Sequence, residues 1–193
     1  MANIIRESVK GLELIPIEDM LLNKNRIFLT EEVNSETTNE LLKKLMYLEH
    51  SETTDEITLF INSPGGDVSS GLAVYDYINI MTKPVNTVCT GTAASMGAIL
   101  FLAGKKRSML PSTRIMIHDP SFSGGNLAGK KPHEIQHDLD KLNESRKKLA
   151  GIIAEKTGKS IDEIYEITKE DSFYNADEAI DFGLATEIYK ETI

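Results

Sequence analysis

The sequence of 193 residues has little cysteine and no long apolar run. Its single cysteine, Cys89, excludes an intrachain disulfide, so nothing in the sequence indicates an oxidising compartment. The longest apolar stretch, residues 98–103, is far too short to span a bilayer. Charges at Arg6, Glu7 and Lys10 interrupt the start, and no apolar core of a secretory signal follows them. These features predict a cytoplasmic protein.

Signatures of nucleotide binding and of a modular chain are also missing. No Gly-x-x-x-x-Gly-Lys phosphate loop is present, and the turn Gly65-Gly66 is too short for a dinucleotide fingerprint. The formal net charge of -9 argues against nucleic acid or an anionic membrane as the main partner. Because no repeat, low-complexity segment or Pro/Gly-rich linker divides the chain, its length favours a single domain.

Short apolar runs alternate with amphipathic helical patterns along the chain. The predicted strands are residues 57–61, 85–89 and 115–117. A possible capping box of Thr37 and Glu40 opens the first predicted helix. The apolar stripe of residues 72–81 marks the second, which Pro84 stops. This alternation is typical of an α/β fold of parallel βαβ units, in which chemistry usually lies at the carboxyl ends of the strands.

A long helix is predicted over residues 133–158, with Pro132 near its start. Such a helix can project from the sheet and pack on another subunit, or it can lie flat on its own domain. The pattern alone leaves both readings open. A capping box of Ser160 with Glu163 predicts a further helix, and residues 176–182 predict the last one.

Residues 91–97 (GTAASMG) are the first candidate for chemistry. Ser95 follows a predicted strand through a turn of small residues and stands at the start of an apolar helix. That position exposes the hydroxyl, and free backbone N–H groups near a helix start stabilise an oxyanion. A plain N-cap is the commoner role of such a serine. The motif therefore leaves a nucleophile and a cap as alternatives.

A serine nucleophile needs a base, normally histidine, and an acid that orients it. The histidines of the chain are His50, His118, His133 and His137. His118 ends a predicted strand at the same sheet edge as Ser95, so we predict that it is the base. The turn at Gly65-Gly66 can supply a second oxyanion donor, because glycine lets the backbone approach a substrate closely.

The orienting acid stays open at this point. Asp119 is adjacent to His118, and neighbouring side chains of a strand point to opposite faces, which makes it a poor orienter. Asp138, Asp140 and Asp171 are equal candidates by spacing.

One motif competes with the serine site. Residues 133–137 (HEIQH) match the H-E-x-x-H pattern of zinc peptidases, with Glu134 as the base. Both of its histidines lie opposite the apolar stripe of the predicted helix, toward solvent. A catalytic zinc site needs a shielded pocket and a third ligand, and His118 is that ligand only if it leaves the serine site. We therefore interpret the motif as a coincidence and predict neither a metal nor a cofactor.

Taken together, these motifs resemble the Clp protease proteolytic subunit family (ClpP). The likeness runs in order from about Arg26 to Ile188. It rests on residues 62–66 (NSPGG), 91–97 (GTAASMG), 116–118 (MIH) and 171–183. The resemblance implies that Ser95 is the nucleophile, His118 the base and Asp171 the orienting acid. It also implies that the backbone N–H groups of the oxyanion hole belong to Gly66 and Met96.

The implied fold is crotonase-like, a spiral of ββα units, with residues 1–193 as one ClpP-like peptidase domain. Residues 1–25 would be a gate or docking segment, 26–131 and 159–193 the head, and 132–158 a "handle" helix that interlocks two seven-membered rings. The implied activity is ATP-dependent protein degradation. A serine endopeptidase would hydrolyse unfolded proteins inside the closed chamber, fed by a AAA+ Clp ATPase, and would itself bind no nucleotide.

The sequence departs from the family pattern at several places. Asp119 stands where the family usually has Gln, and residues 121–129 differ from the usual Gly-rich segment that pairs with extended substrate. Lys169 and Glu170 reverse the charges of the acidic-then-Arg pair that usually bridges the rings. The start, residues 1–25, lacks the usual segment of the axial gate. These changes cluster at assembly and docking surfaces and spare the triad. We therefore interpret the chain as a divergent second paralog.

Two alternatives come from other functional classes. The first is a regulatory or conditionally active ring subunit that needs a second paralog of the family. The second is a crotonase-like acyl-CoA enzyme, which would use the same oxyanion hole without a triad. The presence of Ser95, His118 and Asp171 argues against the second.

Overall fold

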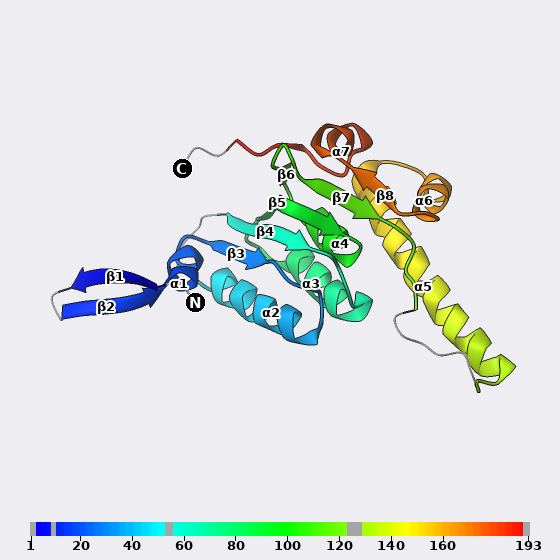
Figure 1. The fold of residues 1–193 in the computed structure, drawn as a ribbon, viewed down its shortest axis with the longest axis horizontal. Coiled ribbons are helices and arrows are strands. Elements are labelled where there is room, and N and C mark those ends of the chain that lie inside the picture. Colours follow the sequence, from blue (N-terminus) through cyan, green and yellow to red (C-terminus); the bar gives the residue numbers. More distant parts are fainter. Residues whose placement is uncertain (1–2, 9–10, 53–55, 123–128, 191–193) are drawn as a thin grey trace.

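The computed structural model describes residues 3–8, 11–52, 56–122 and 129–190 of the chain. Figure 1 shows a central sheet with helices packed against it and one long helix that extends beyond it. Within the described residues the sheet has seven strands, in the order β3-β4-β5-β6-β9, and β7 pairs with both β5 and β8. The strands are β3 (Arg26–Leu29), β4 (Ile57–Ser63), β5 (Val85–Ala94), β6 (Arg107–Met109), β7 (Arg114–Ile117), β8 (Ser172–Tyr174) and β9 (Glu187–Ile188).

The predicted alternation of strands and helices is confirmed. The pairs β3·β4, β4·β5 and β5·β7 are parallel, and β8 joins β7 in the antiparallel direction. An antiparallel hairpin of β1 (Asn3–Ser8) and β2 (Gly11–Pro16) precedes the sheet. The helices are α1 (Ile17–Leu22), α2 (Ser35–Glu49), α3 (Val68–Ile80), α4 (Met96–Leu102), α5 (Pro132–Thr157), α6 (Ile161–Thr168) and α7 (Ala176–Phe182).

The core lies between the sheet and the helices around α4. Every residue of α4 is buried, which explains why its sequence is apolar on all sides. The helix stands directly after β5, so the buried segment also holds the carboxyl end of that strand in place. Within the described residues no helix is both long and apolar enough to cross a bilayer.

Strand β5 is longer than predicted. The apolar pattern predicts an end at Cys89, whereas the strand continues to Ala94. Its first half pairs with β6 at Thr87 to Cys89, and its second half pairs with β7 at Thr92 to Ala94. This change of partner keeps the backbone of the polar second half hydrogen-bonded, so a strand persists there without an apolar run.

The predicted cap of α2 is wrong by one turn. The helix begins at Ser35, and the side chain of Asn34 accepts hydrogen bonds from the N–H groups of Glu36 and Thr37. In return the hydroxyl of Thr37 accepts the N–H of Asn34. Thr37 therefore completes the capping box instead of opening it, because an asparagine at the N-cap is at least as favourable as a threonine. Glu40 pairs with Lys43 on the helix surface.

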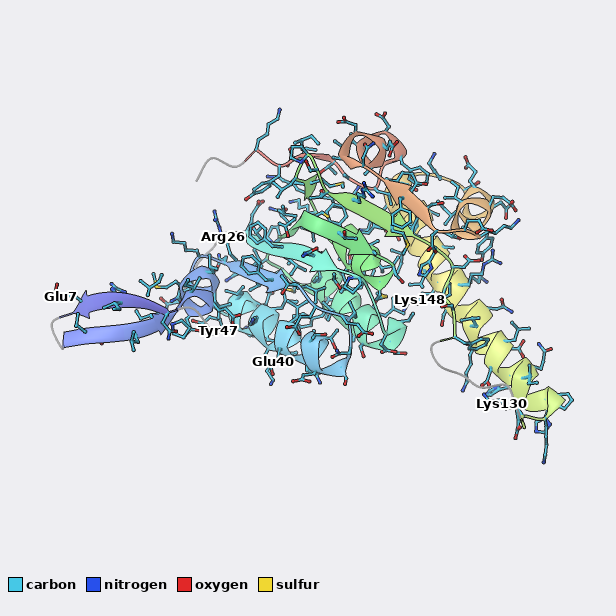
Figure 2. All side chains as sticks on the ribbon, in the orientation of Figure 1. Glu7, Arg26, Glu40, Tyr47, Lys130 and Lys148 are labelled. Atoms are coloured by element: carbon cyan, nitrogen blue, oxygen red, sulfur yellow. The ribbon has the colours of Figure 1, made fainter. Side chains whose placement is uncertain are left out.

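The predictions for the later helices are confirmed. Helix α5 begins at Pro132 and is followed by Gly158 in the left-handed conformation, with φ at 73°. Its buried residues lie in the last third, from Leu149 to Ala154. The first half extends beyond the sheet, and Figure 2 shows Lys130 at the far end of this region and Lys148 close to the body. The helix therefore projects from the sheet over its first half and packs on its own domain over its last third.

The cap of α3 allows a stability prediction. Asp67 accepts the backbone N–H of Ser70 at 2.7 Å, and the hydroxyl and N–H of Ser70 lower the pKa of Asp67. Asp67→Ala should destabilise the protein by about 1 kcal/mol at neutral pH. Because the folded-state pKa is depressed, the carboxylate stabilises the fold above the unfolded-state pKa, and this contribution is lost as the pH falls through the folded-state value.

Denaturant unfolding of the wild type, Asp67→Ala and Asp67→Asn over a range of pH checks this prediction. The difference between wild type and Asp67→Ala should shrink on acidification. Asp67→Asn is the matched control, because it keeps an N-cap acceptor that does not titrate. A difference between wild type and Asp67→Ala that stayed constant to low pH would contradict a role for the ionised carboxylate.

Candidate active site

Three polar side chains from different elements meet at the carboxyl edge of β5 and β7. Ser95 follows β5, His118 follows β7, and Asp171 precedes β8. Nε2 of His118 lies 2.8 Å from Oγ of Ser95, which is hydrogen-bond distance. Nδ1 of His118 lies 3.2 Å from Oδ1 of Asp171. The imidazole thus stands between a hydroxyl and a carboxylate.

Ser95 occupies a strained turn between β5 and α4. Its φ is +52° and its ψ is -121°, a conformation that residues other than glycine rarely adopt. The turn is held by the N–H of Ser95, which donates to the carbonyl of Met116 on β7 at 2.9 Å. Although Ser95 stands at the N-cap position, its side chain makes no capping hydrogen bond. The hydroxyl faces His118 instead, so the plain N-cap reading of this serine is wrong.

The glycine turn after β4 approaches the serine very closely. A Cβ atom on Gly65 would lie 2.7 Å from Cβ of Ser95 and 2.8 Å from the backbone nitrogen of Met96. Gly65 and Gly66 have φ values of +92° and +146°, in the region that favours glycine. Only glycine therefore fits at this turn without strain.

Two backbone N–H groups at this turn are candidates for binding an oxyanion. The N–H of Val33 donates to the carbonyl of Gly65, and the carbonyl of Val33 accepts the N–H of Asp67. In such a parallel bridge the N–H of the residue between them, Gly66, points away from Val33. Met96 is the first residue of α4, where an N–H has no acceptor within the helix. Both donors are thus available for hydrogen bonds outside the ladder and the helix.

The four candidate carboxylates have different partners. Asp171 is the one that lies within ion-pair distance of His118, and its side chain is 61% exposed. Asp119 lies beside Arg146 and Thr168. On α5, Asp138 pairs with Lys130, and Asp140 accepts a hydrogen bond from Gln136. Residues 118 and 119 lie beyond the end of β7, so strand alternation does not set their orientations. Asp119 does not orient the imidazole because its carboxylate contacts Arg146 and Thr168 instead.

A small apolar pocket opens beside the serine. It is lined by Val68, Ser95, Met96, Ile99, Ile117, His118, Pro120, Leu149 and Ile153. Leu149 and Ile153 come from α5, more than 50 residues after the serine in the chain. The spacing of these two residues predicts that they face a core, but no local signal in the sequence links them to the site.

The H-E-x-x-H motif lies on the projecting end of α5. His133 and His137 are exposed, and the carboxylate of Glu134 accepts the backbone N–H of Lys131 at 2.7 Å. Glu134 thus caps the helix. Across the described parts of the chain, no group of three or more metal-ligating side chains comes together.

The model of the Clp protease family matches residues 10–192. The chain belongs to the Clp protease family. Membership indicates a serine peptidase of the ClpP type, with the mixed α/β fold described above, peptide substrates and, in general terms, assembly into rings with Clp ATPases. It favours this class over the acyl-CoA reading, which shares the fold without the peptidase chemistry.

The departures of this Clp protease from the family pattern have a structural context. Asp119 binds residues of α5 and α6, as described above. Lys169 pairs with Glu166 of its own chain at 2.7 Å. Residues 1–25 include the β1–β2 hairpin and α1. Of the unusual segment at residues 121–129, positions 123–128 lie outside the described residues.

Proposed function

We propose that the chain is a serine endopeptidase subunit in which Ser95 is the nucleophile, His118 the general base and Asp171 the orienting acid. The observation that carries the proposal is the 2.8 Å contact between Nε2 of His118 and Oγ of Ser95. A base at hydrogen-bond distance can take the hydroxyl proton as the oxygen attacks a peptide carbonyl. With Nδ1–H directed at Asp171, the imidazole has the tautomer that leaves Nε2 free to accept.

The reaction follows from this arrangement. Oγ of Ser95 bonds to the carbonyl carbon while its proton moves to Nε2 of His118, and the carbonyl oxygen becomes an oxyanion. The N–H groups of Gly66 and Met96 bind that oxyanion. The imidazolium then gives its proton to the leaving amine, and the C–N bond breaks. Water, deprotonated by the same imidazole, hydrolyses the acyl-enzyme and regenerates Ser95.

The apolar lining beside Ser95 supports a preference for an apolar side chain next to the cleaved bond, and the pocket, at about 20 Å³, has to widen to admit one. Val68, Ile99 and Ile117 line it from the body, and Leu149 and Ile153 line it from α5. Burial of an apolar group here is favoured by about 25 cal/mol per Å² of surface removed from water.

For the assembly, we assign one peptidase domain to the chain, with α5 as the handle between two stacked rings. The exposed first half of this helix, where Leu139 is 42% exposed, supports a contact with another subunit. The β1–β2 hairpin would serve as the gate or docking segment for a AAA+ Clp ATPase that feeds unfolded chains into the chamber. Its exposed apolar side chains include Ile5, Leu12 and Leu14.

A conditionally active ring subunit is the second candidate. The observation that favours it is the pair of Lys169 and Glu166 within one chain, at the place where the family bridges the rings. The pair is exposed, at 55% and 72%, and holds the lysine only weakly, but Lys169 puts a positive charge where the family has an acidic residue. On this reading the triad needs a second paralog in the ring before it turns over substrate.

The deciding experiment is an assay of a fluorogenic peptide with wild type and Ser95→Ala, each alone and mixed with a second Clp proteolytic subunit from the same organism. We expect Ser95→Ala to lower kcat by at least about 10³-fold, because no other group can form the acyl-enzyme. A chelator and His137→Ala should leave the rate unchanged, since neither touches the serine site.

The outcomes separate the candidates. Activity of the wild type alone supports an autonomous peptidase, and activity only in the mixture supports the conditional subunit. If Ser95→Ala kept the wild-type rate, or if a chelator removed it, the serine mechanism would be wrong.

A further inference from the structure

Backbone hydrogen bonds join the segment that carries His118 to the segment that carries Asp171, on both sides of the contact between these two side chains. On one side, Ile117 of β7 pairs with Ser172 of β8 in the antiparallel register. On the other side, the backbone N–H that follows the histidine, that of residue 119, donates to the carbonyl of Thr168 at 2.7 Å. The imidazole and the carboxylate therefore lie between two backbone anchors.

Side chains reinforce the second anchor. The hydroxyl of Thr168 lies 2.6 Å from Oδ1 of Asp119 and 2.9 Å from the carbonyl of Ile164. Its single proton can go to either acceptor, and an ionised carboxylate is the stronger one. Thr168 is buried, with 3% of its surface exposed, whereas 29% of the Asp119 side chain is exposed, so this contact is partly shielded from water.

Helix α5 supplies the third member of this cluster. Nε of Arg146 lies 2.7 Å from Oδ2 of Asp119, and the guanidinium stacks 4.2 Å above the ring of Tyr165 on α6. Nε is buried, and its N–H is not aligned for a hydrogen bond, so the contact with Asp119 is an ion pair. Both side chains are about seven-tenths buried, since 30% and 29% of them are exposed. The pair joins α5 to the chain that follows the histidine.

We propose that Asp119 and Arg146 are positioning residues, whose ion pair holds the second anchor so that the imidazole of His118 meets Asp171. The inference rests on the proposed catalytic function of His118 and Asp171. Its physical reason is the exposure of Asp171, which is 61% exposed and therefore gains little from its contact with His118 alone. The geometry of the triad must then come from the segments on either side. A displacement of about 1 Å at a reacting group can cost about 10²-fold in rate.

A direct effect of the Asp119 charge on the neighbouring imidazole is the competing explanation. Asp119→Asn removes a negative charge, whereas Arg146→Met leaves that charge without its partner. An electrostatic effect therefore changes kcat in opposite directions in the two variants. A positioning role lowers kcat in both, because each variant breaks the same ion pair.

The test measures kcat and KM of Asp119→Asn, Arg146→Met and the double variant in the assembled enzyme, or in the mixed ring if only that is active. We expect each single variant to lose roughly tenfold in kcat with little change in KM, and the double variant to lose no more than either single one. Arg146→Lys keeps the charge and should recover most of the rate. Lys148→Met is the matched control, because it breaks another α5 ion pair, with Asp76 at 3.6 Å, away from the triad.

The Asp119→Asn substitution, made in an Asp171→Asn enzyme, separates a positioning role from a general loss of stability. If Asp119 acts through the triad acid, Asp119→Asn should lower the residual rate of an Asp171→Asn enzyme no further. Three results would overturn the proposal. The first is an equal loss from Asp119→Asn in the wild-type and Asp171→Asn enzymes. The others are opposite effects of Asp119→Asn and Arg146→Met on kcat, or an unchanged kcat in both of these variants. Covalent labelling of Ser95 by a fluorophosphonate, followed by mass spectrometry, separates failure of the positioning proposal from failure of the proposed serine mechanism. If the serine mechanism is wrong, the wild type itself is not labelled at Ser95.

Discussion

Asp171→Asn should fold and assemble normally and lose about 10³-fold or more in kcat. Nδ1 of His118 lies 3.2 Å from the carboxylate of Asp171, and a neutral amide there cannot stabilise the imidazolium that forms when Ser95 attacks. An asparagine can also donate to Nδ1, which favours the tautomer with its proton on Nε2 and so disables the base. Steady-state hydrolysis of a fluorogenic peptide measures the loss.

Asp140→Asn is the matched control for this variant. By sequence spacing Asp140 is as good a candidate for the orienting acid, yet in the structure it accepts a hydrogen bond from Gln136 on the exposed face of α5. We expect it to keep the wild-type rate. An Asp171→Asn enzyme as active as the control would remove Asp171 from the proposed mechanism and leave a dyad of Ser95 and His118.

Gly65→Ala should show the second large effect, on both stability and rate. A Cβ atom at this position would meet the carbonyl of Ala94 at 2.6 Å and the backbone nitrogen of Met96 at 2.8 Å. Because both obstacles are backbone atoms, the turn or the start of α4 has to move. We expect a loss of several kcal/mol, the sum of a clash and a left-handed φ of +92°. Any protein that folds should lose about 10²-fold in kcat, since the N–H of Met96 is displaced.

Gly158→Ala isolates the conformational part of this effect. Gly158 has a φ of +73°, but nothing lies within 4 Å of the place that a Cβ atom would take. This control should lose about 1 kcal/mol in stability and keep its kcat. Thermal unfolding and peptide hydrolysis of both variants make the comparison. Equal losses in the two variants would mean that the close approach to Met96 does not constrain the turn.

Local signals in the sequence were sufficient for most of the helices. Pro132 and Gly158 bound α5, and the capping box of Ser160 and Glu163 opens α6, because a cap is made by residues three or four positions apart. The same locality explains the error at α2. Asn34 and Thr37 form an equivalent pair one turn earlier, and a pattern search cannot rank two adjacent caps without their hydrogen bonds.

The candidate site was predictable only in part. The positions of Ser95 and His118 at strand ends indicate a shared sheet edge, because parallel strands bring their carboxyl ends together. The resemblance to the Clp proteases selects Asp171 from the carboxylates, which spacing could not do. Whether the hydroxyl of Ser95 caps α4 or faces His118 depended on the direction of one side chain, which a sequence does not contain.

The tertiary structure decided the contacts between segments that are far apart in the chain. It turned Asp119 toward Arg146 and Thr168, and it brought Leu149 and Ile153 of α5 to the pocket beside the serine. Caps, turns and periodic burial involve a few neighbouring residues, so the sequence carries them directly. The partner of a charged side chain or the wall of a pocket depends on sheet register and helix packing, which only the folded chain establishes.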